Sequence, residues 1–191
     1  MANHSKKGVR DGTTLGFLDE TGVSDRAIVH TTWSKKGLTP IIASCGGWKS
    51  RTVIGTLLAR PNGTYARIVF SILSHAVRAD DVINFLTLLK QRMQGRKLLL
   101  LLDGLPAHRA RKVRIWVHEN KTWLTTYRFP AYAPELNPIE YVWSASKHKD
   151  LANVCPKNMR ELEKRVVKSI KRIIDSKTVL RGCLKASALF C

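Results

Sequence analysis

The run of five consecutive leucines at Leu98–Leu102 is the feature that most limits the folds open to this chain. Asp103 follows it directly, and no longer apolar run occurs in the 191 residues. Five residues are about a quarter of the length that crosses a bilayer. So short a run is instead typical of a strand buried on both faces, as in a parallel sheet. Such a sheet needs helices on its faces, so the run predicts an α/β fold.

The residues around this strand alternate between helical and extended periodicity. Val82, Phe85, Leu86, Leu89 and Met93 recur at helical spacing before a glycine, which predicts a helix over residues 80–94. The turn at residues 61–63 joins two β-branched runs, which predicts a hairpin. The full prediction is strands over 13–19, 51–59, 65–71, 97–103 and 123–127, with helices over 80–94, 108–119, 138–149 and 157–176.

Three segments lie outside this regular pattern. Residues 1–12 are predicted to be a flexible basic tail, and residues 24–50 an insertion with one short strand at 40–44. The main domain then covers residues 13–150, and residues 151–191 form a basic, helical C-terminal extension.

The charge of the chain points to a polyanionic partner. Its 33 Lys and Arg residues against 14 Asp and Glu residues give a net charge of +19. Nucleic acid is the first candidate, an anionic membrane surface the second, and a merely basic solvated surface the plain alternative. Neither a membrane span nor a secretory signal is evident, so we expect no membrane association. The four cysteines show no zinc-ribbon or disulfide spacing, which suits a reducing interior.

Two carboxylates that follow apolar strands are the chemically informative residues. Asp19 comes after one predicted strand and Asp103 after another, and neighbouring parallel strands would bring their side chains together. Glu140, in the first turn of a helix that Asn137 could cap, is the best third acid, with Glu135 as competitor. Carboxylates suit Mg²⁺, and two ions about 4 Å apart would clamp both oxygens of a phosphoryl displacement. Taken alone, either aspartate would be better explained as a residue that forms the turn after a strand.

Three motifs carry a resemblance to a known family. They are LGFLDETG around Asp19, LLLLLDGLPAHRA around Asp103, and YAPELNPIEYVW around Glu140. With them, residues 13–150 resemble the catalytic domain of DDE transposases, in particular the mariner-like superfamily and its bacterial insertion-sequence relatives. The chain departs from the common pattern at Gly104, where Asn is usual, and at Ala133, where Ser is usual.

The resemblance implies a fold, a site and a reaction. The fold would be a ribonuclease-H-like mixed sheet flanked by helices, with an insertion after the first strand. Asp19, Asp103 and Glu140 would be the catalytic and metal-binding residues, holding two Mg²⁺ or Mn²⁺ ions. The reaction would be hydrolysis at transposon ends, then attack of the freed 3′-hydroxyl on target DNA.

The resemblance also implies partners. The insertion occupies the place of a loop that reaches a second subunit in relatives, so we expect a homodimer on paired DNA ends. Relatives carry helix-turn-helix modules ahead of the catalytic domain. Two explanations are therefore open: a separate polypeptide supplies DNA recognition, or the chain is a truncated copy. The expected location is the cytoplasm of a bacterium or archaeon, at the nucleoid.

Basic and aromatic residues near these motifs are the candidates for DNA contact. His108 is equally well explained as a capping or solvated residue. Trp33 and Trp48 could stack on bases or on a partner surface, but the favoured interpretation is that they anchor the insertion on the sheet. Trp116 and Trp143 are assigned to the core. The predicted contacts are Trp33, Lys35, Lys36, Lys49, Arg51, His108, Arg109 and Lys147.

Two other functions remain open. The first is an inactive transposase relic that acts as a DNA-binding or regulatory protein, and the second is a ribonuclease-H-like nuclease without strand transfer. The intact acidic triad favours an enzyme over the relic.

Overall fold

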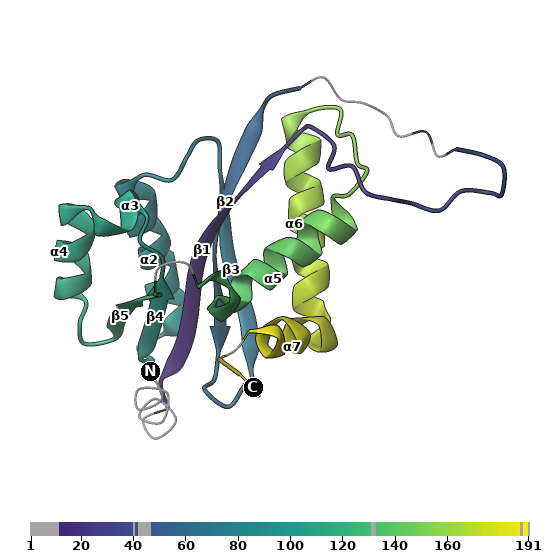
Figure 1. Ribbon diagram of the computed structural model, residues 1–191. Coiled ribbons are helices and arrows are strands. Elements are labelled where there is room, and N and C mark those ends of the chain that lie inside the picture. Colours follow the sequence, from purple (N-terminus) through teal and green to yellow (C-terminus); the bar gives the residue numbers. More distant parts are fainter. Residues whose placement is uncertain (1–11, 40, 42–46, 131–132, 188, 191) are drawn as a thin grey trace.

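A five-stranded mixed sheet with helices on both faces forms the body of the molecule (Figure 1). The computed structural model describes residues 12–39, 41, 47–130, 133–187 and 189–190. The strand order is β3-β2-β1-β4-β5. The strands are β1 (Thr14–Ser24), β2 (Ser50–Ala59), β3 (Ala66–Leu73), β4 (Leu98–Leu102) and β5 (Leu124–Arg128). The helices are α2 (Ala79–Met93), α3 (Pro106–Arg109), α4 (Arg111–Glu119), α5 (Pro138–Ala145), α6 (Met159–Asp175) and α7 (Lys177–Ala186).

The sheet divides into an antiparallel half and a parallel half that share β1. β1, β2 and β3 are antiparallel neighbours, whereas β4 runs parallel to both β1 and β5. The hairpin between β2 and β3 turns at Gly63, whose φ of +68° is readily adopted by glycine. The α/β fold class, the hairpin and the parallel leucine strand predicted from the sequence are therefore confirmed.

Each face of the sheet has its own hydrophobic core. Alternate residues of β1 point to opposite faces, so Phe17 packs in the core under α5, α6 and α7, and Leu18 in the core under α2 and α4. Figure 1 shows the two groups of helices on either side of the sheet. Both side chains are at most 1% exposed, so the sheet is covered on both faces here.

Four features of the chain differ from the prediction by more than two residues. β1 does not end at Asp19 but runs to Ser24, because β2 pairs with it along its whole length, from Leu15↔Ala59 to Ser24↔Ser50. The helix predicted over 108–119 is split at Ala110, whose ψ of 142° is extended rather than helical. The helix from Pro138 passes at Ser146 into a π-helical turn, η2 (Ser146–Asp150).

The end of the chain holds the fourth difference. The helix predicted over 157–176 is confirmed as α6, but it is followed by α7, which we did not predict. Ser176 ends α6 and caps α7 through its side chain, which accepts a hydrogen bond from the backbone N–H of Val179. The sequence does not separate these helices because no proline or glycine lies between them.

The insertion leaves the body as an extended arm (Figure 1). Its base is held by Asn153, which accepts a hydrogen bond from the backbone of His30 and donates one back to its carbonyl, at 2.8 and 3.0 Å. Ile28 forms an isolated parallel bridge with Ala152. Of the short strand predicted at 40–44, residues 40 and 42–44 lie outside the described residues.

Two findings concern the expectations about membranes and cysteines. None of the helices in the described part of the chain is long and apolar enough to span a membrane. Cys155 is disulfide-bonded, which the spacing of the cysteines did not predict.

Candidate active site at the diverging edge of β1 and β4

Asp19 lies where β1 leaves β4. The parallel ladder between these strands ends at Phe17↔Leu101, while β1 continues along β2. Extending the same register would put Asp19 opposite Asp103, directly after β4. Asp19 was predicted at a strand end, but it is the sixth of eleven residues of β1. It still marks an end, that of the parallel pairing.

Asp19 is buried on the α5 face of the sheet. It is 7% exposed, and its Oδ2 accepts a hydrogen bond from the indole Nε1 of Trp143 at 3.1 Å. Trp143 reaches it across Gly55, the residue paired with Asp19 on β2: a Cβ at Gly55 would lie 2.6 Å from Cη2 of the indole. The predicted core position of Trp143 is thus confirmed, but the hydrogen bond was not foreseen.

Burial, and after it the charge of Glu140, raise the pKa of Asp19 from 3.8 to about 7. Glu20 and Asp103 act in the same direction more weakly, and a backbone hydrogen bond at Glu20 opposes them. A carboxyl group that is buried beside other carboxylates holds its negative charge only at a cost. A cation at this edge would remove that cost.

Asp103 is held by two donors on one of its oxygens. Its Oδ1 accepts from the backbone N–H of Leu105 at 3.0 Å and lies 2.8 Å from Nδ1 of His108. The other ring nitrogen of His108, Nε2, lies 2.9 Å from Oε1 of Glu20. The hydrogen bond from His108 lowers the pKa of Asp103. Burial lowers the pKa of His108, but the hydrogen bonds to Asp103 and Glu20 outweigh it and raise that pKa to about 9.

Glu140 lies in the first turn of α5 and is exposed. Its charge raises the pKa of Asp19, and Trp143, on the same helix, donates a hydrogen bond to the Asp19 carboxylate. Asn137 does precede α5, but its side chain makes no cap hydrogen bond, contrary to prediction, and its buried Oδ1 has no partner among the described residues. The competing acid Glu135 is exposed on the short helix η1 (Pro134–Leu136).

The three predicted acids therefore gather around one edge, although not as a closed cluster. Among the described residues, the group with ligand atoms all within 4.8 Å of one another is Glu20, Asp103 and His108. Glu20 points to the opposite face of the sheet from Asp19, because consecutive strand residues alternate. Neither Glu20 nor the bridging role of His108 was predicted. The available signal was the Asp19-Glu20 pair on one strand, which puts an acid on each face.

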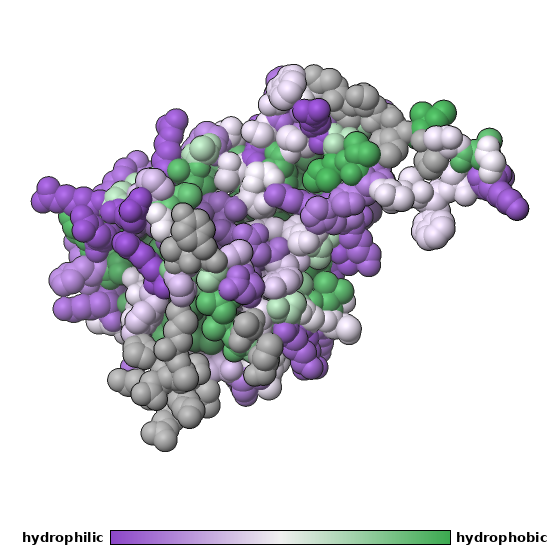
Figure 2. All heavy atoms as spheres, in the orientation of Figure 1, coloured by the Kyte–Doolittle hydropathy of each residue, from purple (hydrophilic) through white to green (hydrophobic). Residues whose placement is uncertain are grey.

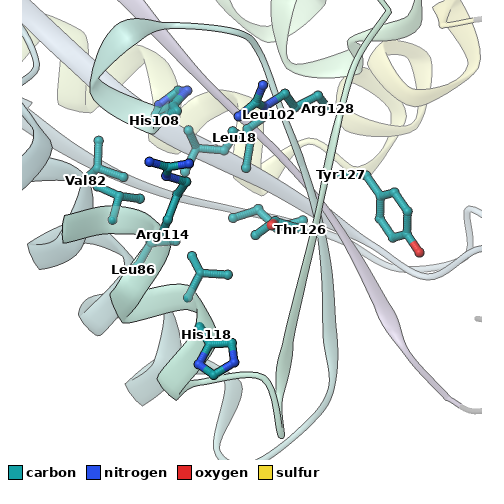
Figure 3. Close-up of a pocket in the computed structure, with 13 residues that line it drawn as sticks. Leu18, Val82, Leu86, Leu102, His108, Arg114, His118, Thr126, Tyr127 and Arg128 are labelled. Carbon is teal, nitrogen blue, oxygen red and sulfur yellow. The ribbon is translucent and has the colours of Figure 1, made fainter. Parts of the chain in front are cut away.

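A cavity of about 330 Å³ lies behind His108, between α4 and the sheet (Figure 3). Leu18, Leu86 and Leu100 contribute to its apolar walls, and Arg114 and Arg128 also line it. His108 thus stands between this apolar cavity and the acids.

The predicted DNA contacts do not all lie on one surface. Trp33, Lys35, Lys36 and Lys49 are exposed on the insertion, and Arg109 is exposed at the end of α3. Trp33 is fully exposed and Trp48 is 84% exposed, so the favoured interpretation of both as anchors on the sheet is wrong.

Two of the predicted contacts, His108 and Arg51, are engaged within the protein, and a third, Lys147, is half-buried. The His108 side chain is 1% exposed and bonded through both nitrogens, so direct contact with a phosphate is not supported. Arg51 forms an ion pair with Glu163 of α6 at 2.5 Å. Lys147, on η2, lines a small cavity together with Thr21 and Trp143, on the Asp19 side of the sheet.

The surface around α4 is predominantly hydrophilic (Figure 2). Arg111, Lys112 and Arg114 are exposed on this helix, and Lys112 forms an ion pair with Asp80. Positive charge therefore lies on the same side of the sheet as His108.

Solved structures of one transposase share this fold. A pre-cleavage Mos1 transpososome aligns with a TM-score of 0.67 at 17% identity, covering 99% of this chain and 56% of the other. A mariner Mos1 paired-end complex with Mg gives 0.67 at 18% identity, with the same coverage. The Mos1 catalytic domain alone gives 0.64 at 16% identity and is covered to 83%. The chain thus spans about half the length of the transposase chains in the complexes.

The likeness confirms the ribonuclease-H-like fold class. No curated protein matches the chain. A family model described as "DDE superfamily endonuclease" matches residues 14–163, which include all three predicted acids. The chain therefore belongs to the DDE superfamily of endonucleases.

Proposed function

We propose that this protein is the catalytic domain of a transposase that cleaves DNA at transposon ends and joins the freed 3′-hydroxyl to target DNA, using Mg²⁺ or Mn²⁺. Membership of the DDE superfamily supports the nuclease chemistry. Solved relatives of the same fold include a paired-end complex with Mn and a strand transfer complex. The observation that carries the proposal is the set of carboxylates around the diverging edge of β1 and β4, with Asp19 buried among them.

The acids fit a divalent cation. The raised pKa of Asp19 reflects a buried carboxyl group repelled by Glu140 and without a cationic partner in a described contact. Carboxylate oxygens are what Mg²⁺ prefers. Asp19, Asp103 and Glu140 would hold the metal, and two bound ions would stabilise charge on the attacking and leaving oxygens of the displacement.

The residues of the chain prepare this site in three ways. Trp143 holds the Asp19 carboxylate through Oδ2 and covers it from the α5 side. Leu105 and His108 hold Asp103 through Oδ1. Glu140 remains exposed at the start of α5, where solvent and DNA have access.

The charge of the chain supports DNA as substrate. A net charge of +19 favours binding to phosphates largely without regard to sequence. The exposed arm, with Trp33, Lys35 and Lys36, is our proposed contact with DNA or with a second subunit in a dimer.

The test is nicking of supercoiled plasmid with Mg²⁺ or Mn²⁺. Asp103→Ala and Glu140→Gln should reduce the nicking rate at least about 100-fold. Replacing a residue that only hydrogen-bonds to a metal ligand already lowers metal affinity or activity about 10–100-fold. Glu135→Gln is the matched control, because Glu135 is an exposed acid five residues from Glu140, and it should retain the rate. Equal rates for the wild type and Asp103→Ala would refute the proposal.

The same reactions separate the alternatives. A transposase should join a labelled 3′-hydroxyl oligonucleotide to the plasmid, whereas a simple nuclease would nick without joining. An inactive relic would bind DNA with no metal-dependent nicking.

A further inference from the structure

The strands β1 and β4 separate before they reach Asp19 and Asp103. Their last registered pair is Phe17↔Leu101, so no ladder hydrogen bond fixes Asp103 relative to β1. Asp103 belongs to the loop between β4 and α3, and a loop carboxylate with one backbone contact is poorly constrained. Something else must hold this loop to β1.

A chain of side chains crosses the gap. Glu20, on β1, contacts Nε2 of His108 at 2.9 Å, and Nδ1 of the same ring contacts Asp103 at 2.8 Å. The ring is 1% exposed, and the Glu20 side chain is only 10% exposed. The Asp103 side chain is 41% exposed, so the contact between His108 and Glu20 is the shielded half of the chain. Charge-assisted hydrogen bonds hold a group more firmly where water is excluded.

The local backbone explains why the ring lies there. α3 is a single turn that starts at Pro106 and stops at Ala110, where the backbone becomes extended. His108 is the buried residue of this turn, whereas its neighbour Arg109 is exposed. The break lets α4 leave in a new direction while His108 stays directed at β1.

The bridge also decides which oxygen of Asp103 is free. Both described contacts of the carboxylate, from Leu105 and from His108, are to Oδ1. This leaves Oδ2 for a cation.

Direct metal binding by Glu20, Asp103 and His108 is the competing explanation, since their ligand atoms lie within 4.8 Å of one another. The contacts argue against it. His108 uses a different nitrogen for each carboxylate, and each pair is already at hydrogen-bond distance. A metal ion placed between one nitrogen and one oxygen, at about 2.0–2.2 Å from each, would have to break that contact.

We propose that Glu20 and His108 are positioning residues: the His108 ring, anchored on Glu20, holds Asp103 through Oδ1 so that its Oδ2 is presented to the divalent cation. This role rests on the proposed function, because it assumes that Asp103 is a metal ligand. Neither Glu20 nor His108 touches the metal or the DNA.

Two isosteric replacements separate the halves of the bridge. In His108→Asn the amide nitrogen takes the place of Nδ1 and keeps the contact with Asp103. In His108→Gln it takes the place of Nε2 and keeps only the contact with Glu20. His118→Gln is the matched control, because His118 lies exposed at the end of α4 and lines the same cavity.

The assay measures the affinity of the DNA-free protein for Mn²⁺ alone. The electron paramagnetic resonance signal reports the concentration of unbound Mn²⁺. We expect His108→Gln to weaken the affinity about 10-fold, the usual scale for groups that orient a metal ligand. His108→Asn, which keeps the contact with Asp103 but loses the anchor on Glu20, should also weaken the affinity, and His118→Gln should equal the wild type. Wild-type affinity in His108→Gln or in His108→Asn would overturn the proposal.

The design distinguishes this role from the proposed function. If Asp103→Asn binds Mn²⁺ like the wild type, the metal site itself is rejected, and the positioning role with it. If Asp103→Asn is weakened but His108→Gln is not, the positioning role alone fails.

A measurement on the wild type decides the case if the variants do not fold. Nitrogen-15 spectra of the imidazole groups at neutral pH should show slowly exchanging protons on both nitrogens of His108, and Glu20→Ala should remove the protection at Nε2. A rapidly exchanging Nε2 proton in the wild type would overturn the proposal.

Discussion

Replacing Asp19 by Asn should make the metal-free protein more stable at alkaline pH than the wild type. The carboxyl group of Asp19 is 7% exposed, and burial together with Glu140 raises its pKa from 3.8 to about 7. The folded protein therefore binds a proton at Asp19 that the unfolded chain has already released. Between pH 4 and pH 7, stability must fall as the pH rises. An asparagine carries no charge, so the variant lacks this loss.

The size of the effect follows from the pKa values. In the range where only the unfolded chain has lost the Asp19 proton, the wild type loses about 1.4 kcal/mol of unfolding free energy for each pH unit. About 2 pH units of this range lie between pH 5 and pH 7. The advantage of the variant over the wild type should thus grow by about 3 kcal/mol between pH 5 and pH 8. For a chain of this size, 3 kcal/mol corresponds to about 6–12 °C in Tm.

The assay is thermal unfolding of both proteins in EDTA at pH 5 and pH 8. The constant cost of placing an amide beside Trp143 cancels when the two pH values are compared. His108, whose raised pKa makes stability fall between pH 6.5 and pH 9, contributes alike to both proteins and also cancels. Adding Mg²⁺ at pH 8 should then raise the Tm of the wild type more than that of the variant.

A Tm difference that is the same at pH 5 and pH 8 would refute the reasoning. It would mean that Asp19 ionises as easily in the folded protein as in the unfolded chain, and that the acids around it exert no repulsion.

Three further predictions concern the surroundings of Asp19 and the charge of the chain. Trp143→Phe removes the donor to Asp19 and should raise the Mn²⁺ concentration needed for half-maximal plasmid nicking. Gly55→Ala places a Cβ 2.6 Å from the indole of Trp143 and should lower stability by about 1–3 kcal/mol in denaturant unfolding; Gly22→Ala, with nothing within 4 Å, is its control, and an equal loss there would contradict the packing argument. DNA binding should weaken steeply with salt and differ little between sequences in a filter-binding titration, and strong preference for one sequence at physiological salt would argue against this.

The sequence alone determined most of the architecture. The five leucines before Asp103, the hairpin turn at Gly63 and the helical spacing over 80–94 each have one physically reasonable outcome, and all were confirmed. These patterns are local, because burial on two faces, a positive φ and a 3.6-residue period each depend on residues that are close together in the sequence. The three acids could be named for the same reason, since each belongs to a short motif.

What the tertiary structure decided depends on partners far apart in the chain. β1 extends past Asp19 because β2 pairs with it there, and Trp143 reaches Asp19 because Gly55, on that partner strand, leaves room for its ring. The bridge from Glu20 through His108 joins residues 88 positions apart. A sequence pattern carries no information on such contacts, because they arise only when β1 and β4 lie side by side and then separate. The leucine strand thus fixed where Asp103 would be, but only the divergence of the two strands showed what holds it there.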